Sequence, residues 1–110
     1  MTETEFIEQA SAVLSRLEAV LDAAADAGEL DCDLERKGTG ILEIEFENAS
    51  KIIVNLQTPM QEIWLAARAG GFHFRHIDGA WRDTRHGTEL IAALQTYIAQ
   101  QSGVTLNLSA

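Results

Sequence analysis

The sequence predicts an α+β fold, a two-layer sandwich in which two helices pack on one face of an antiparallel sheet of about six strands. Apolar residues recur at helical spacing over residues 3–27 and 88–101. Between these segments, apolar and polar residues alternate in six short runs joined by short turns, which is typical of antiparallel neighbours. Each helix has one apolar stripe and each strand one apolar face, so we expect both helices to cover the same face of the sheet.

Length and composition limit the class of protein. A chain of 110 residues is expected to form one domain over residues 1–110, with a modest core. The single cysteine, Cys32, excludes an internal disulfide. No apolar run approaches the ~20 residues that cross a bilayer, and the acidic N-terminus is unlike a secretory or transit peptide. We therefore expect a cytoplasmic protein without membrane contacts.

The charge is unevenly distributed along the chain. The formal net charge is −9. Residues 1–50 carry thirteen Asp and Glu against three Lys and Arg, whereas residues 51–110 carry four against five. A nucleic-acid-binding protein would be basic, so this class is disfavoured. A cation or a basic protein surface is the partner that such a chain would attract.

The first predicted helix covers residues 3–27. Thr2 and Glu5 have the spacing of a capping box, and Gly28 is suited to end the helix. The apolar stripe consists of Phe6, Ala10, Val13, Leu14, Leu17 and Leu21.

An acidic edge lies beside this stripe. Glu18, Asp22 and Asp26 follow one another at intervals of four residues, a spacing at which like charges repel. Helix stability therefore does not explain them.

The next segment, residues 30–35, alternates as a strand and precedes a loop predicted over residues 36–40. We expect Leu30, Cys32 and Leu34 to face the core, and Asp31, Asp33 and Glu35 to face outward. Because this strand follows the helix directly, the outward acids should lie beside the acidic edge of the helix.

Together these carboxylates form the strongest candidate site, a surface for hard cations such as iron, magnesium, manganese or calcium. Open carboxylates on rigid elements would bind weakly, at several positions and with strong salt dependence. The alternative is a solvated acidic face that aids solubility. The candidate metal ligands are Glu18, Asp22, Asp26, Glu29, Asp31 and Asp33.

Residues 41–47 form another alternating strand, and residues 50–74 then read as strand, turn, strand, turn, strand. Asn55 and Gln57 lie opposite the apolar face of their strand, and Trp64 lies opposite the apolar face of the next. We therefore expect Trp64 to be exposed beside the two amides. A slip of one residue would bury Trp64 instead, together with both amides, which is costly without partners.

The rest of the chain contains a hairpin and the second helix. Pro59 marks the turn between the two central strands, and Gly70 and Gly71 are expected to interrupt the chain. Asp78 and Gly79 predict a hairpin joining residues 73–77 to 80–83. Gly103 should end the second helix, and residues 104–108 form either a strand or an extended tail. The second apolar stripe consists of Leu90, Ile91, Leu94, Tyr97 and Ile98.

Catalytic motifs are absent from the sequence. It contains no nucleophile elbow, phosphate-binding loop or C-x-x-C pair, and Cys32 is expected to be a buried apolar residue. His73 and His76 should point to opposite faces of their strand, so they cannot chelate one ion together. They are either solvated histidines, or His73 is an axial ligand for haem or another planar metal complex.

A longer motif resembles a known family. Residues 55–66 read N-x-Q-x-P-x-x-x-I-W-L-A, preceded by L-D-C-D at 30–33 and E-N-A-S-K at 47–51, and followed by G-G-F-H-F at 70–74. This pattern resembles the frataxin family, in particular its bacterial CyaY-like branch. The resemblance spans essentially the whole chain, and it implies the same two-layer sandwich.

The resemblance also implies a function. Frataxins are non-enzymatic iron-binding regulators of iron–sulfur cluster assembly, and their acidic ridge binds ferrous or ferric iron and contacts a cysteine desulfurase. By matched position the ridge residues are Glu18, Asp22, Asp31 and Asp33, with Asp26 and Glu29 beside them. The matched interaction surface on the sheet, which would contact the scaffold protein, is Asn55, Gln57 and Trp64.

Two further functions stay open. One is a haem- or porphyrin-linked protein that uses the open sheet face and His73. The other is an iron oxidase, ranked last because the sequence lacks the paired E-x-x-H helices of a closed di-iron site. We expect a monomer, with metal-dependent oligomers as the open alternative.

Overall fold

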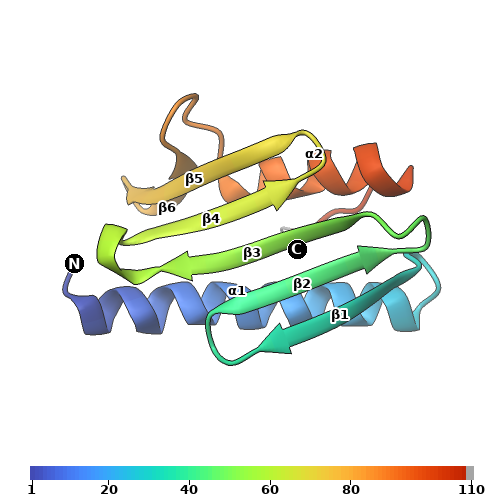
Figure 1. The fold of residues 1–110 in the computed structure, drawn as a ribbon, viewed down its shortest axis with the longest axis horizontal. Helices are drawn as coiled ribbons and strands as arrows, with labels where there is room; N and C mark the ends of the chain where they lie inside the picture. The colour runs from blue at the N-terminus through green and yellow to red at the C-terminus, as the bar shows by residue number, and fades with distance from the viewer. Residues whose placement is uncertain (109–110) are drawn as a thin grey trace.

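The computed structural model describes residues 1–108 as a two-layer α+β sandwich, the predicted fold class (Figure 1). Its sheet has six antiparallel strands in the order β1-β2-β3-β4-β5-β6, and both helices lie behind one face of it. The elements are α1 (Glu3–Asp26), β1 (Cys32–Lys37), β2 (Ile41–Phe46), β3 (Lys51–Gln57), a 3-10 turn η1 (Thr58–Met60), β4 (Glu62–Ala67), β5 (Gly70–Ile77), β6 (Ala80–Asp83) and α2 (Leu90–Ser102).

The predicted ends of α1 are confirmed. Thr2 accepts a hydrogen bond from the backbone of Glu5, and the Glu5 side chain accepts one from Thr2, which completes a capping box. After the helix, Gly28 has φ +76°, a left-handed conformation that glycine adopts without strain. The chain therefore turns sharply from α1 into β1.

The core lies between the sheet and the helices, and it confirms the predicted strand phase. Val54 and Leu65 are buried, whereas Asn55 and Trp64 on the other face of their strands are only half-buried. Hence the register in which Trp64 would be a core residue is wrong. The largest fully buried side chains are Phe6, Phe74, Leu14, Leu17, Leu21, Leu42, Ile44, Ile52, Ile63, Leu65, Leu90 and Leu94.

Two loop predictions are wrong. Arg36 and Lys37 continue β1, because they pair with β2 and because the Arg36 side chain packs against α1. Gly70 and Gly71 begin β5 instead of interrupting the chain. Gly70 has φ +144°, which only glycine adopts readily, and it pairs with Ala67 across a tight turn.

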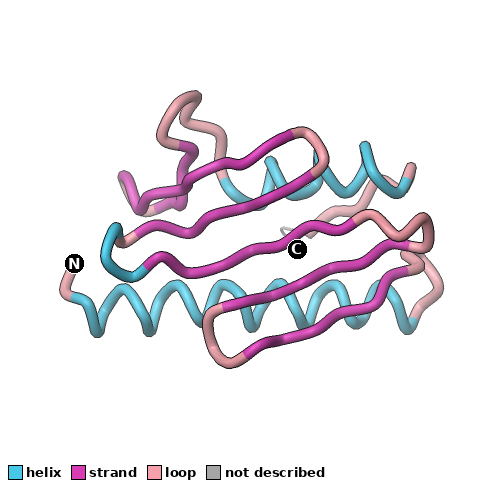
Figure 2. Tube along the Cα trace, viewed as in Figure 1, coloured by secondary structure: helices cyan, strands magenta, loops and turns pink. Residues whose placement is uncertain are grey.

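The tail after α2 is not a strand. Figure 2 shows it as a loop that turns back behind the sheet. Leu106 and Leu108 are buried there, and the Leu108 backbone N–H donates to Gln95 Oε1 at 2.7 Å. This settles the open alternative for residues 104–108 in favour of an extended, packed tail. Within residues 1–108, neither helix is long and apolar enough to span a membrane.

Candidate functional site

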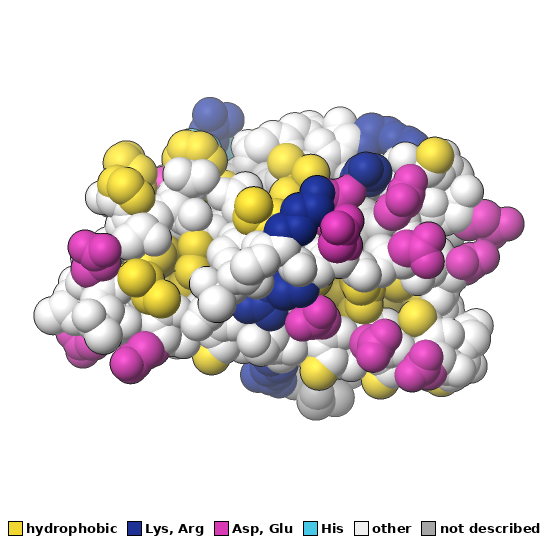
Figure 3. All heavy atoms as spheres, turned by 60° about the horizontal axis from the view of Figure 1, so that its bottom comes forward, with side chains coloured by type: hydrophobic (Ala, Val, Ile, Leu, Met, Phe, Trp, Pro, Cys, Tyr) yellow, Lys and Arg dark blue, Asp and Glu magenta, His cyan; other side chains and the backbone are white. Residues whose placement is uncertain are grey.

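The six candidate metal ligands, which we call the acidic ridge, lie along the end of α1, the turn after it and the start of β1. Five of them are exposed and Glu18 is half-buried. In Figure 3 acidic side chains crowd the part of the visible face where α1 leads into β1. The ridge comprises Glu18, Asp22, Asp26, Glu29, Asp31 and Asp33.

Acids from the helix and from the strand act on a common point, Cys32. This half-buried thiol has a raised pKa, first because burial disfavours the thiolate and then because the charges of Asp33, Asp31 and Asp22 oppose it. The carboxylates of α1 and β1 therefore combine into one negative field. The same field keeps Cys32 protonated, which is unfavourable for a reactive thiol.

Arg36 neutralises one end of the ridge. Its Nη1 lies 3.3 Å from Glu18 Oε1 and also donates to Ser15 Oγ at 3.2 Å, while Nη2 donates to the carbonyl oxygens of Ser11 and Thr39. The Arg36 side chain is only 16% exposed, so this contact is part of the packing of β1 on α1. Glu18 is thus held by a protein cation, unlike the acids further along the ridge.

The other ridge acids are separate side chains without a common cage. No group of three or more His, Cys, Asp or Glu side chains among residues 1–108 is arranged to hold a metal ion. Asp22, Asp26 and Asp31 make no hydrogen bond or ion pair within the same part of the chain. This arrangement can attract cations by its summed charge, but it does not preform a coordination sphere.

Self-repulsion in the ridge leads to a stability prediction. Asp22→Asn or Asp31→Asn should leave the free energy of unfolding of the metal-free protein unchanged or raise it by up to ~1 kcal/mol. Each substitution removes one of several mutually repelling charges, and no hydrogen bond or ion pair is lost. Adding a divalent cation should raise the Tm of the unmodified protein, because the cation binds the folded state.

Thermal unfolding monitored by circular dichroism measures both effects. The matched control is Glu8→Gln, on α1 but outside the ridge, which should retain the full rise in Tm with the cation. A clearly destabilised Asp22→Asn protein without metal would mean that Asp22 has a structural role.

A second cluster lies on the open face of the sheet, and we call it the open-face array. The register places two rows of three residues side by side on β3, β4 and β5. One row is Asn55, Trp64 and His73, and the other is Gln57, Glu62 and Arg75.

Stacking changes the expected exposure of Trp64. The indole is stacked on His73, with ring centroids 4.2 Å apart and planes inclined by 6°, so Trp64 is half-buried and the expectation of a largely exposed ring is wrong. Beside it, Gln57 Nε2 donates to Asn55 Oδ1 at 2.7 Å. The other strand histidine, His76, contacts the ring of Trp81 on the helix-covered face, which confirms that the two histidines are on opposite faces.

Glu62 and Arg75 are the two members of this array that sequence reasoning missed, and Glu62 lies at its centre. The Glu62 side chain is 4% exposed, and it accepts hydrogen bonds from Trp64 Nε1 at 2.9 Å and from Arg75 Nη2 at 2.7 Å. His73 Nδ1 lies 3.5 Å from the same carboxylate. Burial raises the pKa of Glu62, but the hydrogen bonds from Trp64 and Arg75 outweigh it and hold the pKa below the usual range. The signal in the sequence was the alternation that places Glu62 on the same face of its strand as Trp64.

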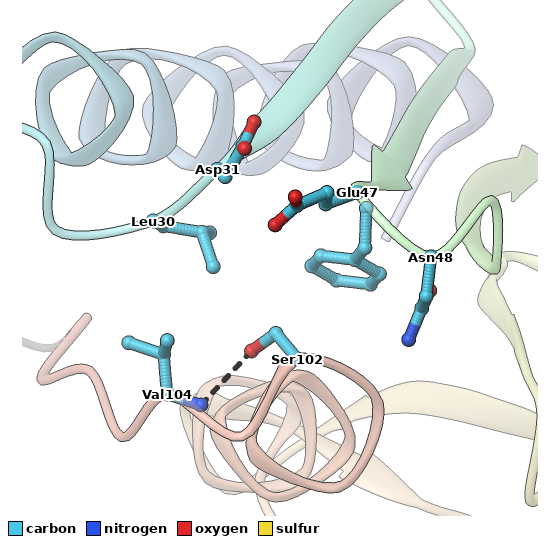
Figure 4. Close-up of a pocket in the computed structure, with 7 residues that line it drawn as sticks. Leu30, Asp31, Glu47, Asn48, Ser102 and Val104 are labelled. Atoms are coloured by element: carbon cyan, nitrogen blue, oxygen red, sulfur yellow. Dashed lines mark hydrogen bonds between the residues drawn. The ribbon is translucent and has the colours of Figure 1, made fainter.

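A groove of about 470 Å³ opens beside the ridge, between the start of β1, the β2–β3 turn and the end of α2. Figure 4 shows Asp31 and Glu47 on one side of it and Ser102 and Val104 on the other, with the Val104 backbone N–H donating to Ser102 Oγ at 3.1 Å. Its described lining contains no nucleophile paired with a base.

Comparisons with known proteins agree with this architecture. The profile of the frataxin-like domain matches residues 1–104. The chain is 56% identical over 110 residues to proteins named iron-sulfur cluster assembly protein CyaY from Burkholderia mallei (strain SAVP1) and Burkholderia pseudomallei (strain 668), covering 100% of both chains in each case.

Solved structures show the same fold. Frataxin from Psychromonas ingrahamii has a TM-score of 0.85 and 31% identity over 100% of both chains. Trimeric frataxin from the yeast Saccharomyces cerevisiae, in a ferrous complex, has a TM-score of 0.73 and 24% identity over 94% of this chain and 88% of the yeast chain.

Proposed function

The chain belongs to the frataxin-like family, and on this basis we propose that it is an iron-binding protein of iron–sulfur cluster assembly. In this proposal the acidic ridge binds iron and also contacts a cysteine desulfurase, whose activity the protein regulates without being an enzyme itself. The relatives named for iron–sulfur cluster assembly support a role in that process. The acidic ridge supports the binding of iron and of the desulfurase.

The observation that carries the proposal is the position of Asp22, Asp31 and Asp33, three exposed carboxylates that lie together at the junction of α1 and β1. These exposed carboxylates are hard oxygen ligands, which suit ferrous and ferric iron. Because they do not enclose an ion, binding should be weak and involve more than one position. The negative field of these carboxylates would steer a basic patch of the desulfurase onto the ridge.

The open-face array serves a second contact in this proposal, with the scaffold protein on which clusters are built. Trp64 and Arg75 are residue types that dominate binding energy at interfaces. The array lies on β3, β4 and β5, whereas the ridge lies at the end of α1 and the edge strand β1, so a scaffold and a desulfurase can approach different parts of the molecule.

Amide chemical shifts on adding ferrous iron under anaerobic conditions test the proposal. We expect the largest changes over residues 22–33, where the ridge lies, and none in the open-face array. The control protein carries Asp22→Asn and Asp31→Asn and should lose most of the response. A response centred away from the ridge, or none at millimolar iron, would contradict the proposed site.

A specific observation favours haem as the second candidate ligand. The His73 side chain is 48% exposed, and its Nδ1 faces the Glu62 carboxylate, which is how metal-bound histidines are often oriented. A haem titration should then give a visible absorption change that His73→Ala abolishes. The remaining candidate, iron oxidation, would appear as oxygen uptake with ferrous iron.

A further inference from the structure

We propose that Glu62 is the positioning residue of the open-face array, whose buried carboxylate holds Trp64, His73 and Arg75 in the arrangement that the scaffold protein recognises. This inference rests on the proposed role of the array in scaffold binding. It adds a residue that makes little contact with solvent and therefore acts through its neighbours.

The burial of Glu62 requires an explanation. A carboxylate removed from water is costly unless it is hydrogen-bonded and paired, yet Glu62 is buried on the face of the sheet that no helix covers. Its cover comes from the three side chains that contact its carboxylate. Two of them, His73 and Arg75, come from β5, and Trp64 comes from β4.

Each contact restrains a different group. The 2.9 Å bond from Trp64 Nε1 to Glu62 Oε1 fixes the plane of the indole, which then stacks on His73. The 2.7 Å bond to Glu62 Oε2 fixes one end of the Arg75 guanidinium, while that side chain stays 53% exposed. The carboxylate thus uses both oxygens to orient one aromatic side chain and one cation.

Such restraint matters for binding because mobile side chains lose conformational entropy when a partner immobilises them. This loss amounts to ~0.5–1.5 kcal/mol for each long side chain. Without Glu62, the Trp64 N–H would lack its acceptor and Arg75 would be free to sample other rotamers. Removal of Glu62 should therefore weaken scaffold binding although Glu62 itself contributes little contact area.

The test compares Glu62→Ala with Glu62→Gln, which keeps one oxygen as an acceptor for Trp64. Two quantities are measured, the affinity for purified scaffold protein and the hydrogen-exchange rate of the Trp64 indole N–H, with Trp81 as the internal reference. We expect Glu62→Ala to weaken binding about tenfold and to speed exchange at Trp64 alone. Glu62→Gln should retain most of the affinity for the scaffold protein and most of the slow exchange of the Trp64 indole N–H.

A matched control and a double variant complete the test. Glu45→Ala removes an open-face glutamate outside the array and should change neither quantity. If Glu62 acts through Trp64, Trp64→Ala and Glu62→Ala combined should weaken binding no more than Trp64→Ala alone, because coupled residues are not additive.

The outcomes separate this inference from the proposed function. Scaffold binding that is weakened by Trp64→Ala but unaffected by Glu62→Ala would overturn the inference. If Trp64→Ala also binds normally, the proposed scaffold contact fails instead, and indole exchange decides the role of Glu62. Faster exchange at Trp64 in Glu62→Ala then supports positioning, and unchanged exchange overturns it.

Discussion

Reversing Asp22 and Asp31 to lysine together is expected to weaken the binding of both iron and the cysteine desulfurase by about tenfold or more at low salt, with the fold intact. Both residues are exposed and make no hydrogen bond among residues 1–108, so their replacement removes charge without disturbing packing. Asp22 lies on α1 and Asp31 immediately precedes β1, and the charges of both contribute to the raised pKa of Cys32. A reversal therefore changes the sign of the potential where a cation or a basic patch would approach.

Titration of the variant with ferrous iron and with purified desulfurase, each at two salt concentrations, measures this effect. The control is Glu3→Lys with Glu8→Lys, which changes the net charge equally but lies at the other end of α1, at least ~20 Å from Asp22 along the helix axis. The difference between the two variants should shrink at high salt, since exposed charges are screened beyond ~8–10 Å. Unchanged desulfurase affinity at low salt would refute the shared ridge and leave a solvated acidic face.

Replacing Trp81 by alanine is expected to lower the free energy of unfolding by about 3–5 kcal/mol, the usual cost of deleting a buried tryptophan. Trp81 is 8% exposed and packs edge-on against Phe6 of α1, with ring centroids 5.8 Å apart. The change removes the aromatic contact between β6 and α1. For a domain of this size the Tm should fall by more than about 10 °C.

Trp64→Ala is the matched comparison, because it deletes the same side chain from the opposite face of the same sheet. Trp64 is half-buried and loses one ring contact and one hydrogen bond, so we expect a clearly smaller stability loss, together with weaker scaffold binding. Denaturant unfolding of both variants and scaffold titration measure these effects. A larger stability loss for Trp64→Ala than for Trp81→Ala would contradict the assignment of the two faces.

The ridge and the array differ in how strongly their residues are held. Ridge acids such as Asp26 stand free in solvent, whereas Glu62 and Trp64 are held by hydrogen bonds and stacking. A free carboxylate can adapt to a hydrated ion, and a fixed indole suits recognition of a protein surface. The two surfaces are thus physically suited to different kinds of partner.

Much of the fold could be predicted from the sequence because its signals are local. Helical spacing located α1 and α2, alternation located six strands and their buried faces, and a capping box marked the start of α1. The proximity of the ridge acids on α1 to those next to and on β1 could be predicted from chain continuity, since only a short turn separates the two elements. The same alternation predicted that the two amides and the indole lie together on the open face.

Tertiary structure alone decided the contacts that depend on which strands and helices become neighbours. Arg36 reads locally as part of a loop, but it lies within reach of Glu18 only because β1 packs beside α1. Glu62 reads as an ordinary surface acid, and its burial requires the register that sets β4 against β5, with Arg75 thirteen residues away. Pairing register is set by the energy of the whole sheet and its core, and local spacing does not encode it.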